Sequence, residues 1–450
     1  MSCVLGIDLG TSYFKAALFD QTGALRGLSR LPVPKRTEGG CCELAIEDFW
    51  RVIGECISGA CAEARIAPEE IVAVSYASQA NSFLLLDEQN HPLTPLILWP
   101  DLRAAEERGR AQTLWEHPRF LSVTGLGIGS PEFMVHKLCW FQEHEPALWA
   151  STRHVLTLAD YFAFGLTGLF QGDQGTAALL GLWDIQRQEW WDEALRAIDL
   201  PARYLGQPLP PGHALGAIST VTAQAFGLRP GVPVIAGSLD HHVAAMGAGL
   251  GSIAPATDST GTVIALLRDC PVWEPRPGCC MGPAAGKVGY YQLTFSNHGA
   301  GILEAYQQRH APEATLPSLL KMAESGEPPH GPPIRAILED AAEEVASLVR
   351  QLYGTHPPAR IVATGGGARS DLWLQLKADH VGAEFVVTQC QEPACLGAAL
   401  LAAVAVGWFP DLSAASAAWV HARKAYAPSA IPQNKQTPLR KAAANRAMSS

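Results

Sequence analysis

The fold class is decided by residues 3–19, which read CVLGIDLGTSYFKAALF. The apolar run 3–9 predicts a buried strand, the three residues that follow predict a turn, and residues 13–19 predict a second strand that returns beside the first. The pattern therefore predicts a β-hairpin at the start of the chain.

The polar residues of this hairpin suit a nucleotide. Gly10 lets the backbone approach a phosphate closely, and Thr11 and Ser12 add hydroxyl donors. Asp8, at the end of the strand, could hold Mg²⁺ directly or through water, and Lys15 could offset phosphate charge. Taken alone, the stretch is equally well interpreted as an ordinary hairpin with a surface aspartate.

A second strand–turn–strand pattern follows in the other half of the chain. Thr260-Gly261-Thr262 offers the same donors and precedes the apolar run 263–267. Such a turn is common by itself, but two hairpins could clamp the phosphates of a nucleotide from both sides of a cleft. The pair predicts two related α/β domains with a cleft between them.

A glycine-rich turn lies further along the chain. Gly365-Gly366-Gly367-Ala368 follows a predicted strand at 361–364 and precedes a predicted helix at 370–380. Small residues there could let an adenosine lie on the backbone, with phosphate near the helix N-terminus. The turn is not a Walker loop, since no Gly-Lys-Ser/Thr follows it. A structural strand–helix turn remains the alternative.

The strongest candidate for a catalytic group is Asp240, within the stretch GSLDHH at 237–242. Phosphoryl transfer to an alcohol needs a carboxylate that can take the proton of the accepting hydroxyl. A helix N-cap aspartate is the common structural alternative. A zinc site formed with His241 and His242 is a weaker one, because adjacent histidines point in different directions.

The stretch LWPDLR at 98–103 could bind a sugar. The face of Trp99 could pack on sugar C–H groups, and Asp101 and Arg103 could bind its hydroxyls. A turn with an internal Asp–Arg pair is an equally good interpretation.

Bulk composition narrows the function class. The net charge of −10 argues against nucleic acid as the main partner. Eleven cysteines without a C-x-x-C pair predict reduced thiols in a cytoplasmic protein. The N-terminus lacks the pattern of a signal peptide, and the uncharged run 393–410 predicts a buried helix rather than a membrane span.

These motifs, in this order, resemble the FGGY carbohydrate kinases of the actin/hexokinase/heat-shock-ATPase superfamily. The resemblance runs from about Val4 to Phe409. It also includes Lys137-Leu138-Cys139-Trp140, Asp160-Tyr161 with Leu166-Thr167-Gly168, Gly231-Val232-Pro233-Val234 before Asp240, and Glu392-Pro393-Ala394-Cys395-Leu396-Gly397. It implies two actin-like, ribonuclease H-like domains around an ATP and sugar cleft.

The resemblance also implies a role for each site residue. Asp240 would be the general base, and Asp8 would lie near Mg²⁺. The phosphates of ATP would bind at Gly10, Thr11, Ser12, Lys15, Thr260, Gly261 and Thr262. The nucleoside would lie at Gly365, Gly366, Gly367, Ala368 and Asp371. The sugar or polyol would contact Gln79, Asn81, Trp99, Asp101, Arg103 and His241.

Two departures from the family pattern bear on the substrate. Xylulose kinases carry Gly-Gln-Met-His-Gly where this chain has Ser78-Gln79-Ala80-Asn81-Ser82, and the Asn-Gln-Arg-Glu of glycerol kinases is also absent. The segment between Gly301 and Arg335 is shorter than is usual in the family. We therefore expect a kinase near the xylulose kinases with a different sugar pocket, and a homodimer is left open.

The expected organisation is an N-terminal kinase domain at 1–236, a shortened C-terminal domain at 237–425 and a disordered tail at 426–450. Two other functions remain at this stage. One is a regulatory pseudokinase that binds a sugar without transferring phosphate, and the other is a nucleotide-driven binding module of the same superfamily.

Overall fold

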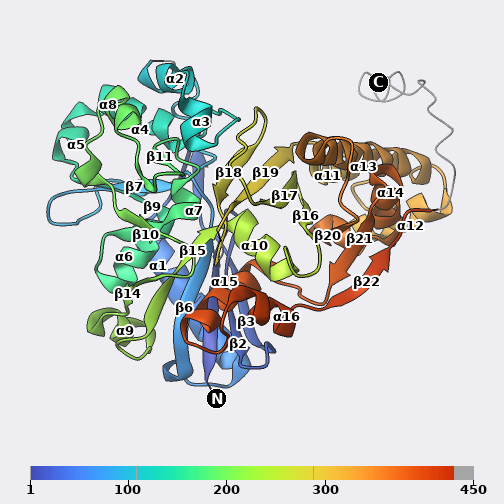
Figure 1. Ribbon diagram of the computed structural model, residues 1–450, viewed down its shortest axis with the longest axis horizontal. Coiled ribbons are helices and arrows are strands. Elements are labelled where there is room, and N and C mark those ends of the chain that lie inside the picture. Colours follow the sequence, from blue (N-terminus) through green and yellow to red (C-terminus); the bar gives the residue numbers. More distant parts are fainter. Residues whose placement is uncertain (1, 108, 287, 430–450) are drawn as a thin grey trace.

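The computed structural model describes residues 2–107, 109–286 and 288–429. Two lobes lie side by side (Figure 1), one drawn mainly in blue to green and the other mainly in yellow to red. Each lobe is built on its own mixed sheet.

The first lobe contains a six-stranded sheet. Its strands lie in the order β14 (Ala214–Ala217), β15 (Pro233–Leu239), β6 (Ile71–Ser78), β1 (Cys3–Leu9), β2 (Tyr13–Asp20) and β3 (Leu25–Pro32). The strands β1, β2 and β3 form an antiparallel meander, and β6 and β15 continue the sheet parallel to β1.

The second lobe contains a seven-stranded sheet. Its strands lie in the order β18 (Cys280–Pro283), β19 (Tyr290–Ser296), β17 (Ile264–Cys270), β16 (Ala256–Thr260), β20 (Arg360–Thr364), β21 (Glu384–Thr388) and β22 (Ala422–Tyr426). Here too a hairpin, β16–β17, is followed by two strands parallel to its first strand, β20 and β21. The two sheets therefore share one plan, as the paired hairpins predict.

The first lobe carries further strands. A third sheet has the order β4 (Arg36–Glu38), β5 (Cys41–Leu44), β8 (Leu96–Ile97), β7 (Phe83–Leu86) and β9 (His154–Thr157). Two short pairs are β10 (Gln171–Asp173) with β13 (Gln207–Leu209), and β11 (Trp183–Asp184) with β12 (Glu189–Trp190).

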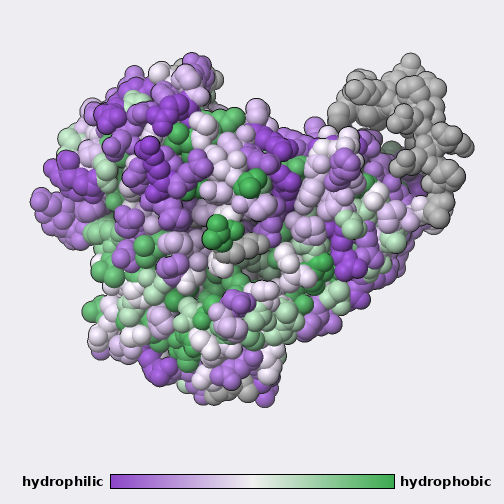
Figure 2. All heavy atoms as spheres, in the orientation of Figure 1, coloured by the Kyte–Doolittle hydropathy of each residue, from purple (hydrophilic) through white to green (hydrophobic). Residues whose placement is uncertain are grey.

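The helices of the first lobe cover these sheets. They are α1 (Ile46–Ala64), α2 (Arg110–Trp115), α3 (Phe120–Thr124), α4 (Met134–His144), α5 (Pro146–Ser151), α6 (Leu158–Thr167), α7 (Gln174–Ala177), α8 (Asp192–Ala197) and α9 (Thr220–Phe226). Hydrophilic residues dominate the upper part of this lobe in Figure 2. There α2 and α8 bury only their apolar residues, such as Leu114 and Leu195.

The remaining helices are α10 (Asp240–Ala248), α11 (Gly301–His310), α12 (Leu316–Ser325), α13 (Gly331–Tyr353), α14 (Asp371–Val381), α15 (Pro393–Ala405) and α16 (Leu412–Trp419). Although α15 lies between β21 and β22 of the second sheet in the chain, it packs on β1 and β6 of the first sheet and against α10. The lobes are thus joined by a helix pair whose N-termini lie near the ends of strands from both sheets (Figure 1).

Glycines permit this packing. A side chain at Gly6 of β1 would place its Cβ 2.0 Å from the carbonyl oxygen of Cys395. A Cβ at Gly247 or at Gly397 would lie 1.9 Å from the carbonyl oxygen of Pro393 or Val243, respectively. Real Cβ atoms never come so close, so only glycine lets β1, α10 and α15 approach one another in this way.

Several predictions about the fold can be compared with the structure. The α/β class with two related domains is confirmed, and all eleven cysteines are free thiols. Among the described residues, none of the helices combines the length and the apolar character that a bilayer crossing requires. The domain boundary between residues 236 and 237 stays a prediction. The last strand of the first sheet, β15, ends at Leu239, and the first strand of the second sheet, β16, begins at Ala256.

Residues 326–333 connect α12 to α13 and include the first turn of α13. Pro332 and Pro333 lie in the first turn of α13, which begins at Gly331. Proline is well suited to that turn, because its missing N–H would have no helical partner there. Most of the predicted tail, residues 430–450, lies outside the described residues. Before it, the backbone N–H of Ser429 donates to Asp379 at 2.7 Å.

Candidate active site

A cleft of about 870 Å³ lies where strand ends from both sheets meet. The first lobe contributes Asp8, Gly10 and Lys15 from the β1–β2 hairpin, and α10 contributes Asp240, His241 and Ala244. The second lobe contributes residues 363–366, 368–369 and 387–394. Residues more than 350 positions apart in the chain therefore face one cavity.

Asp8, Lys15 and Glu392 form a chain of charges in the cleft. Asp8 and Lys15 are direct neighbours across β1 and β2, and Lys15 Nζ lies 3.1 Å from Asp8 Oδ2 and 2.7 Å from Glu392 Oε2. Burial raises the pKa of Asp8 to about 6, Lys15 opposes this rise, and the charge of Asp240 adds to it. Burial lowers the pKa of Lys15, but Asp8 and Glu392 outweigh it and hold that pKa above its usual value.

Asp240 is the first residue of α10 and follows directly on β15. Its Oδ1 accepts the backbone N–H of His241 at 2.7 Å, which fixes the orientation of the carboxylate. Asp240 and His241 both line the cleft. His242, by contrast, points away into the core, where its Nδ1 lies 3.1 Å from Ser238 Oγ and its ring stacks on Tyr291. The zinc alternative therefore receives no support from this geometry.

The glycine-rich turn forms the second side of the cleft. Gly365, Gly366 and Ala368 line it, and Gly365 has a φ of 77°, a left-handed conformation that suits glycine. Gly367 is buried beneath the turn, where its Cβ would lie 2.9 Å from Thr260 Cβ. Asp371 lies outside the cleft lining and binds Lys424 and Tyr426 at the surface instead.

The hydroxyls of the two hairpin turns do not line the cleft. Thr11 Oγ1 accepts the indole N–H of Trp99 at 2.7 Å, and Thr260 Oγ1 donates to Asp258 at 2.8 Å. Ser12 and Thr262 are exposed at the turns, and a side chain at Gly261 would meet open space. The Thr11 hydroxyl is therefore bonded to Trp99, one of the residues predicted to contact the sugar. The Thr260 hydroxyl points into the interior of the second lobe.

Gln79 and Asn81 are structural links in this conformation. The amide nitrogen of Gln79 donates to the carbonyl oxygens of Leu9 and Gly10, so it fastens the first hairpin to the loop after β6. Asn81 has a φ of 63°, and its Oδ1 accepts the N–H of Met134 at the start of α4 at 3.0 Å. Both side chains are buried, and neither lines the cleft.

Trp99 is held from three sides. Its indole donates to Thr11, its backbone N–H donates to Ser82, and its carbonyl oxygen accepts Lys137 Nζ at 2.9 Å. Lys137 is completely buried, and burial lowers its pKa to about 7. The ring is therefore fixed beside the first hairpin.

Asp101 and Arg103 form the internal pair that the sequence left open as an alternative. Arg103 Nε lies 2.8 Å from Asp101 Oδ1, and its Nη2 lies 2.5 Å from Glu43 Oε1. Burial raises the pKa of Asp101, but hydrogen bonds from Arg103 and Cys42 outweigh it and hold that pKa below its usual range. Asp101 is wholly buried, so it orients Arg103 rather than meeting a ligand.

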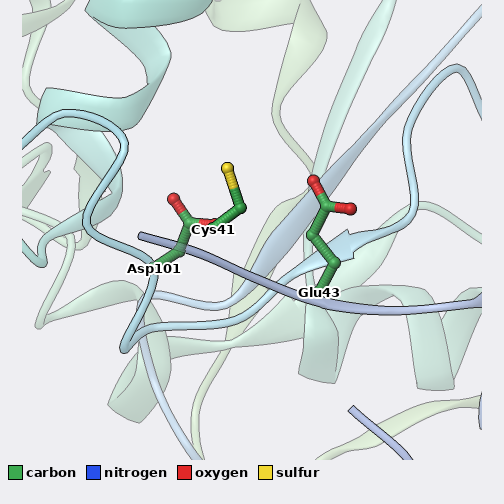
Figure 3. Close-up of side chains that lie close together, drawn as sticks. All are labelled: Cys41, Glu43 and Asp101. Carbon is green, nitrogen blue, oxygen red and sulfur yellow. The ribbon is translucent and has the colours of Figure 1, made fainter. Parts of the chain in front are cut away.

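Cys41, Glu43 and Asp101 have metal-ligand atoms within 4.8 Å of one another and come from β5 and the loop after β8 (Figure 3). The Arg103 guanidinium binds both carboxylates, so the positive charge that a metal ion would supply is already present. This cluster is an ion-pair network.

Sequence reasoning missed three groups of the cleft. Glu392 was recognised only as part of a motif, although it pairs with Lys15. Arg30 from β3 and Arg423 from β22 line the cleft from opposite lobes. No local pattern marks them, because they reach the cleft only through the order of the strands.

Comparison with known proteins supports the kinase interpretation. Residues 3–247 match the N-terminal domain of the FGGY family of carbohydrate kinases, and residues 310–406 match its C-terminal domain. The chain is 27% identical to a xylulose kinase of Lactococcus lactis over 94% of this chain and 92% of that protein. It is also 27% identical to a glycerol kinase of Trichlorobacter lovleyi over 95% of each.

Solved structures show the same fold. A gluconate kinase of Lactobacillus acidophilus superposes with a TM-score of 0.84 and 23% identity, covering 95% of this chain and 94% of that chain. A xylulose kinase of the same organism gives a TM-score of 0.85 and 22% identity, with the same coverage. The chain belongs to the FGGY family of carbohydrate kinases, enzymes that transfer a phosphoryl group to a sugar.

Proposed function

We propose that the enzyme transfers the terminal phosphoryl group of MgATP to a hydroxyl of a small ketose or polyol, with Asp240 as the general base. One observation carries this proposal. Asp240 lies in the same cleft as the Asp8–Lys15 pair and the Gly365–Gly366 turn. A nucleotide lying along the turn would thus have an acidic side chain near its phosphate end.

The donor side of the cleft fits MgATP. Gly365 and Gly366 offer exposed backbone with no side chain in the way, and Lys15 supplies positive charge. Asp8 supplies a carboxylate oxygen, the ligand type that Mg²⁺ prefers. When bound there, Mg²⁺ would neutralise charge on the phosphoryl oxygens. The N-terminus of α15, at Pro393, also faces the cleft and adds favourable partial charge for phosphate.

Asp240 has the chemistry that the acceptor needs. Its Oδ1 is held by the N–H of His241, so the carboxylate is oriented before a substrate arrives. It would take the proton of the acceptor hydroxyl as the oxygen attacks the phosphorus, and a base of this kind contributes about 10²–10⁴-fold to the rate. His241, beside it in the cleft, is placed to hydrogen-bond a neighbouring hydroxyl.

The acceptor class rests on the relatives and on the departures in the pocket. Proteins similar to this chain are named xylulose, gluconate and glycerol kinases. Here Ala80 and Asn81 replace the Met-His of xylulose kinases. The side-chain oxygen of Asn81 already accepts a hydrogen bond from the backbone N–H of Met134 at the start of α4. We therefore propose a small polyhydroxylated acceptor, with Trp99 as the apolar face against its C–H groups.

A coupled ADP-release assay tests the function. The acceptors should include D-xylulose, L-xylulose, D-ribulose, erythrulose, glycerol, xylitol and gluconate, with a reaction lacking any acceptor as the control. We expect ADP release that depends on one of the ketoses or polyols. ADP release at the same rate with and without an acceptor would favour a nucleotide-driven binding module. Thermal stabilisation of the protein by a sugar, without ADP release, would favour a pseudokinase.

A further inference from the structure

The second lobe contains a closed polar triangle beneath the glycine-rich turn. Lys377 of α14 is completely buried, and its Nζ lies 2.5 Å from Asp258 Oδ2 and 2.6 Å from Thr260 Oγ1. The Thr260 hydroxyl donates in turn to Asp258 Oδ1 at 2.8 Å. The ammonium group also lies 5.1 Å from the ring centre of Trp373.

This triangle joins the elements that carry the predicted nucleotide motifs. Asp258 and Thr260 belong to β16, which leads into the turn at Gly261, and Lys377 belongs to the helix after the glycine-rich turn. A Cβ at Gly365 would lie 2.6 Å from the carbonyl oxygen of Thr260. Any shift of Thr260 would therefore displace the turn that lines the cleft.

Stability alone gives little reason for this arrangement. Burying two charges costs desolvation energy, and replacing a buried ion pair by well-packed apolar residues is often neutral or stabilising. The ion pair instead fixes the orientation of the Thr260 side chain, because Lys377 can donate to the Thr260 hydroxyl only when that hydroxyl points inward. That constraint fixes the end of β16 against the glycine-rich turn.

We propose that Lys377 is a positioning residue for the nucleotide: through Asp258 and Thr260 it sets the spacing between the turn at Gly261 and the turn at Gly365–Gly366. The inference rests on the proposed function, since it assumes that MgATP lies along the Gly365–Gly366 turn. Lys377 itself does not touch the ligand.

MgADP affinity, measured by titration calorimetry, tests this role together with thermal unfolding. Lys377→Met and Thr260→Val are expected to weaken MgADP binding by about tenfold or more. Thr260→Ser keeps the hydroxyl, so it should bind MgADP within about twofold of the native enzyme. Arg360→Met is the matched control, because it removes an exposed ion pair with Glu384 at the far end of β20.

A double variant separates positioning from mere stability. Asp258→Leu with Lys377→Met removes both buried charges, so its melting temperature should approach that of the native enzyme while MgADP binding stays weak. Recovery of affinity together with stability would overturn the inference, and so would unchanged affinity in Thr260→Val. Failure of the native enzyme to bind MgADP would instead overturn the proposed function itself.

Discussion

Two aspartates at opposite ends of the β1–β2 hairpin have opposite electrostatic environments. Asp8 is the last residue but one of β1 and lines the cleft, and burial raises its pKa to about 6 despite Lys15. Asp20 ends β2, and although burial raises its pKa, hydrogen bonds from Thr22 and Ala24 and the charge of Arg26 hold it below the usual value. The charge on Asp20 therefore stabilises the fold, whereas the charge on Asp8 opposes folding.

Asp8→Asn is expected to stabilise the protein at neutral pH and to abolish most phosphoryl transfer. Because the folded-state pKa of Asp8 is raised, its contribution to stability is present below the unfolded pKa of about 3.9 and is lost as pH rises through about 6. The melting temperature of the variant should therefore exceed that of the native enzyme by a few degrees at pH 7.5, and less at pH 5. Calorimetric melting across this range measures the difference.

Asp20→Asn is the matched control, because its effect on the melting temperature should have the opposite sign. A lowered folded-state pKa gives stability that is present above the unfolded pKa and lost as pH falls. This variant should melt below the native enzyme at pH 7.5, and the gap should close toward pH 4. Equal melting of Asp8→Asn and native enzyme at every pH would contradict the account of Asp8.

At the scale of elements, α15 links the two lobes. Its small residues let it lie against β1 and α10, and the residue before it, Glu392, pairs with Lys15. At three glycines, Gly6, Gly247 and Gly397, the nearest atoms of the neighbouring element belong to its backbone and not to a flexible side chain. A methyl group at any of them could be accommodated only if an entire element moved.

Gly397→Ala is expected to destabilise the protein by about 1–3 kcal/mol, the usual cost of overpacking. The new Cβ would lie 1.9 Å from the carbonyl oxygen of Val243, so α15 would have to move away from α10. Gly129→Ala is the control, since its Cβ would meet the Trp115 ring at an ordinary 3.4 Å. Denaturant unfolding compares the two, and equal stability of both variants would refute the packing argument.

Local elements could be predicted from the sequence, and long-range partners could not. The helix predicted at 370–380, both hairpins and the strand before Gly365 follow from local patterns and match the structure. The Asp101–Arg103 pair, two residues apart, was foreseeable as one of two alternatives. The partners of Thr11 and Thr260 were not, because Trp99 and Lys377 lie 88 and 117 residues away.

At the scale of the whole molecule, the cleft exists because two lobes of one plan face each other across the α10–α15 pair. Asp8 comes from the first sheet, Asp240 from the helix between the lobes, and the Gly365–Gly366 turn from the second sheet. Closure of such a cleft on both substrates would exclude water and limit wasteful ATP hydrolysis.

The most direct test of the central claim compares Asp240→Asn with the native enzyme. The asparagine Oδ1 can still accept the N–H of His241, so α10 should begin unchanged. With the best acceptor of the panel, we expect phosphoryl transfer to fall by about 10²–10⁴-fold while MgADP affinity stays the same. Native turnover in Asp240→Asn would remove this carboxylate from the role of base and contradict the account.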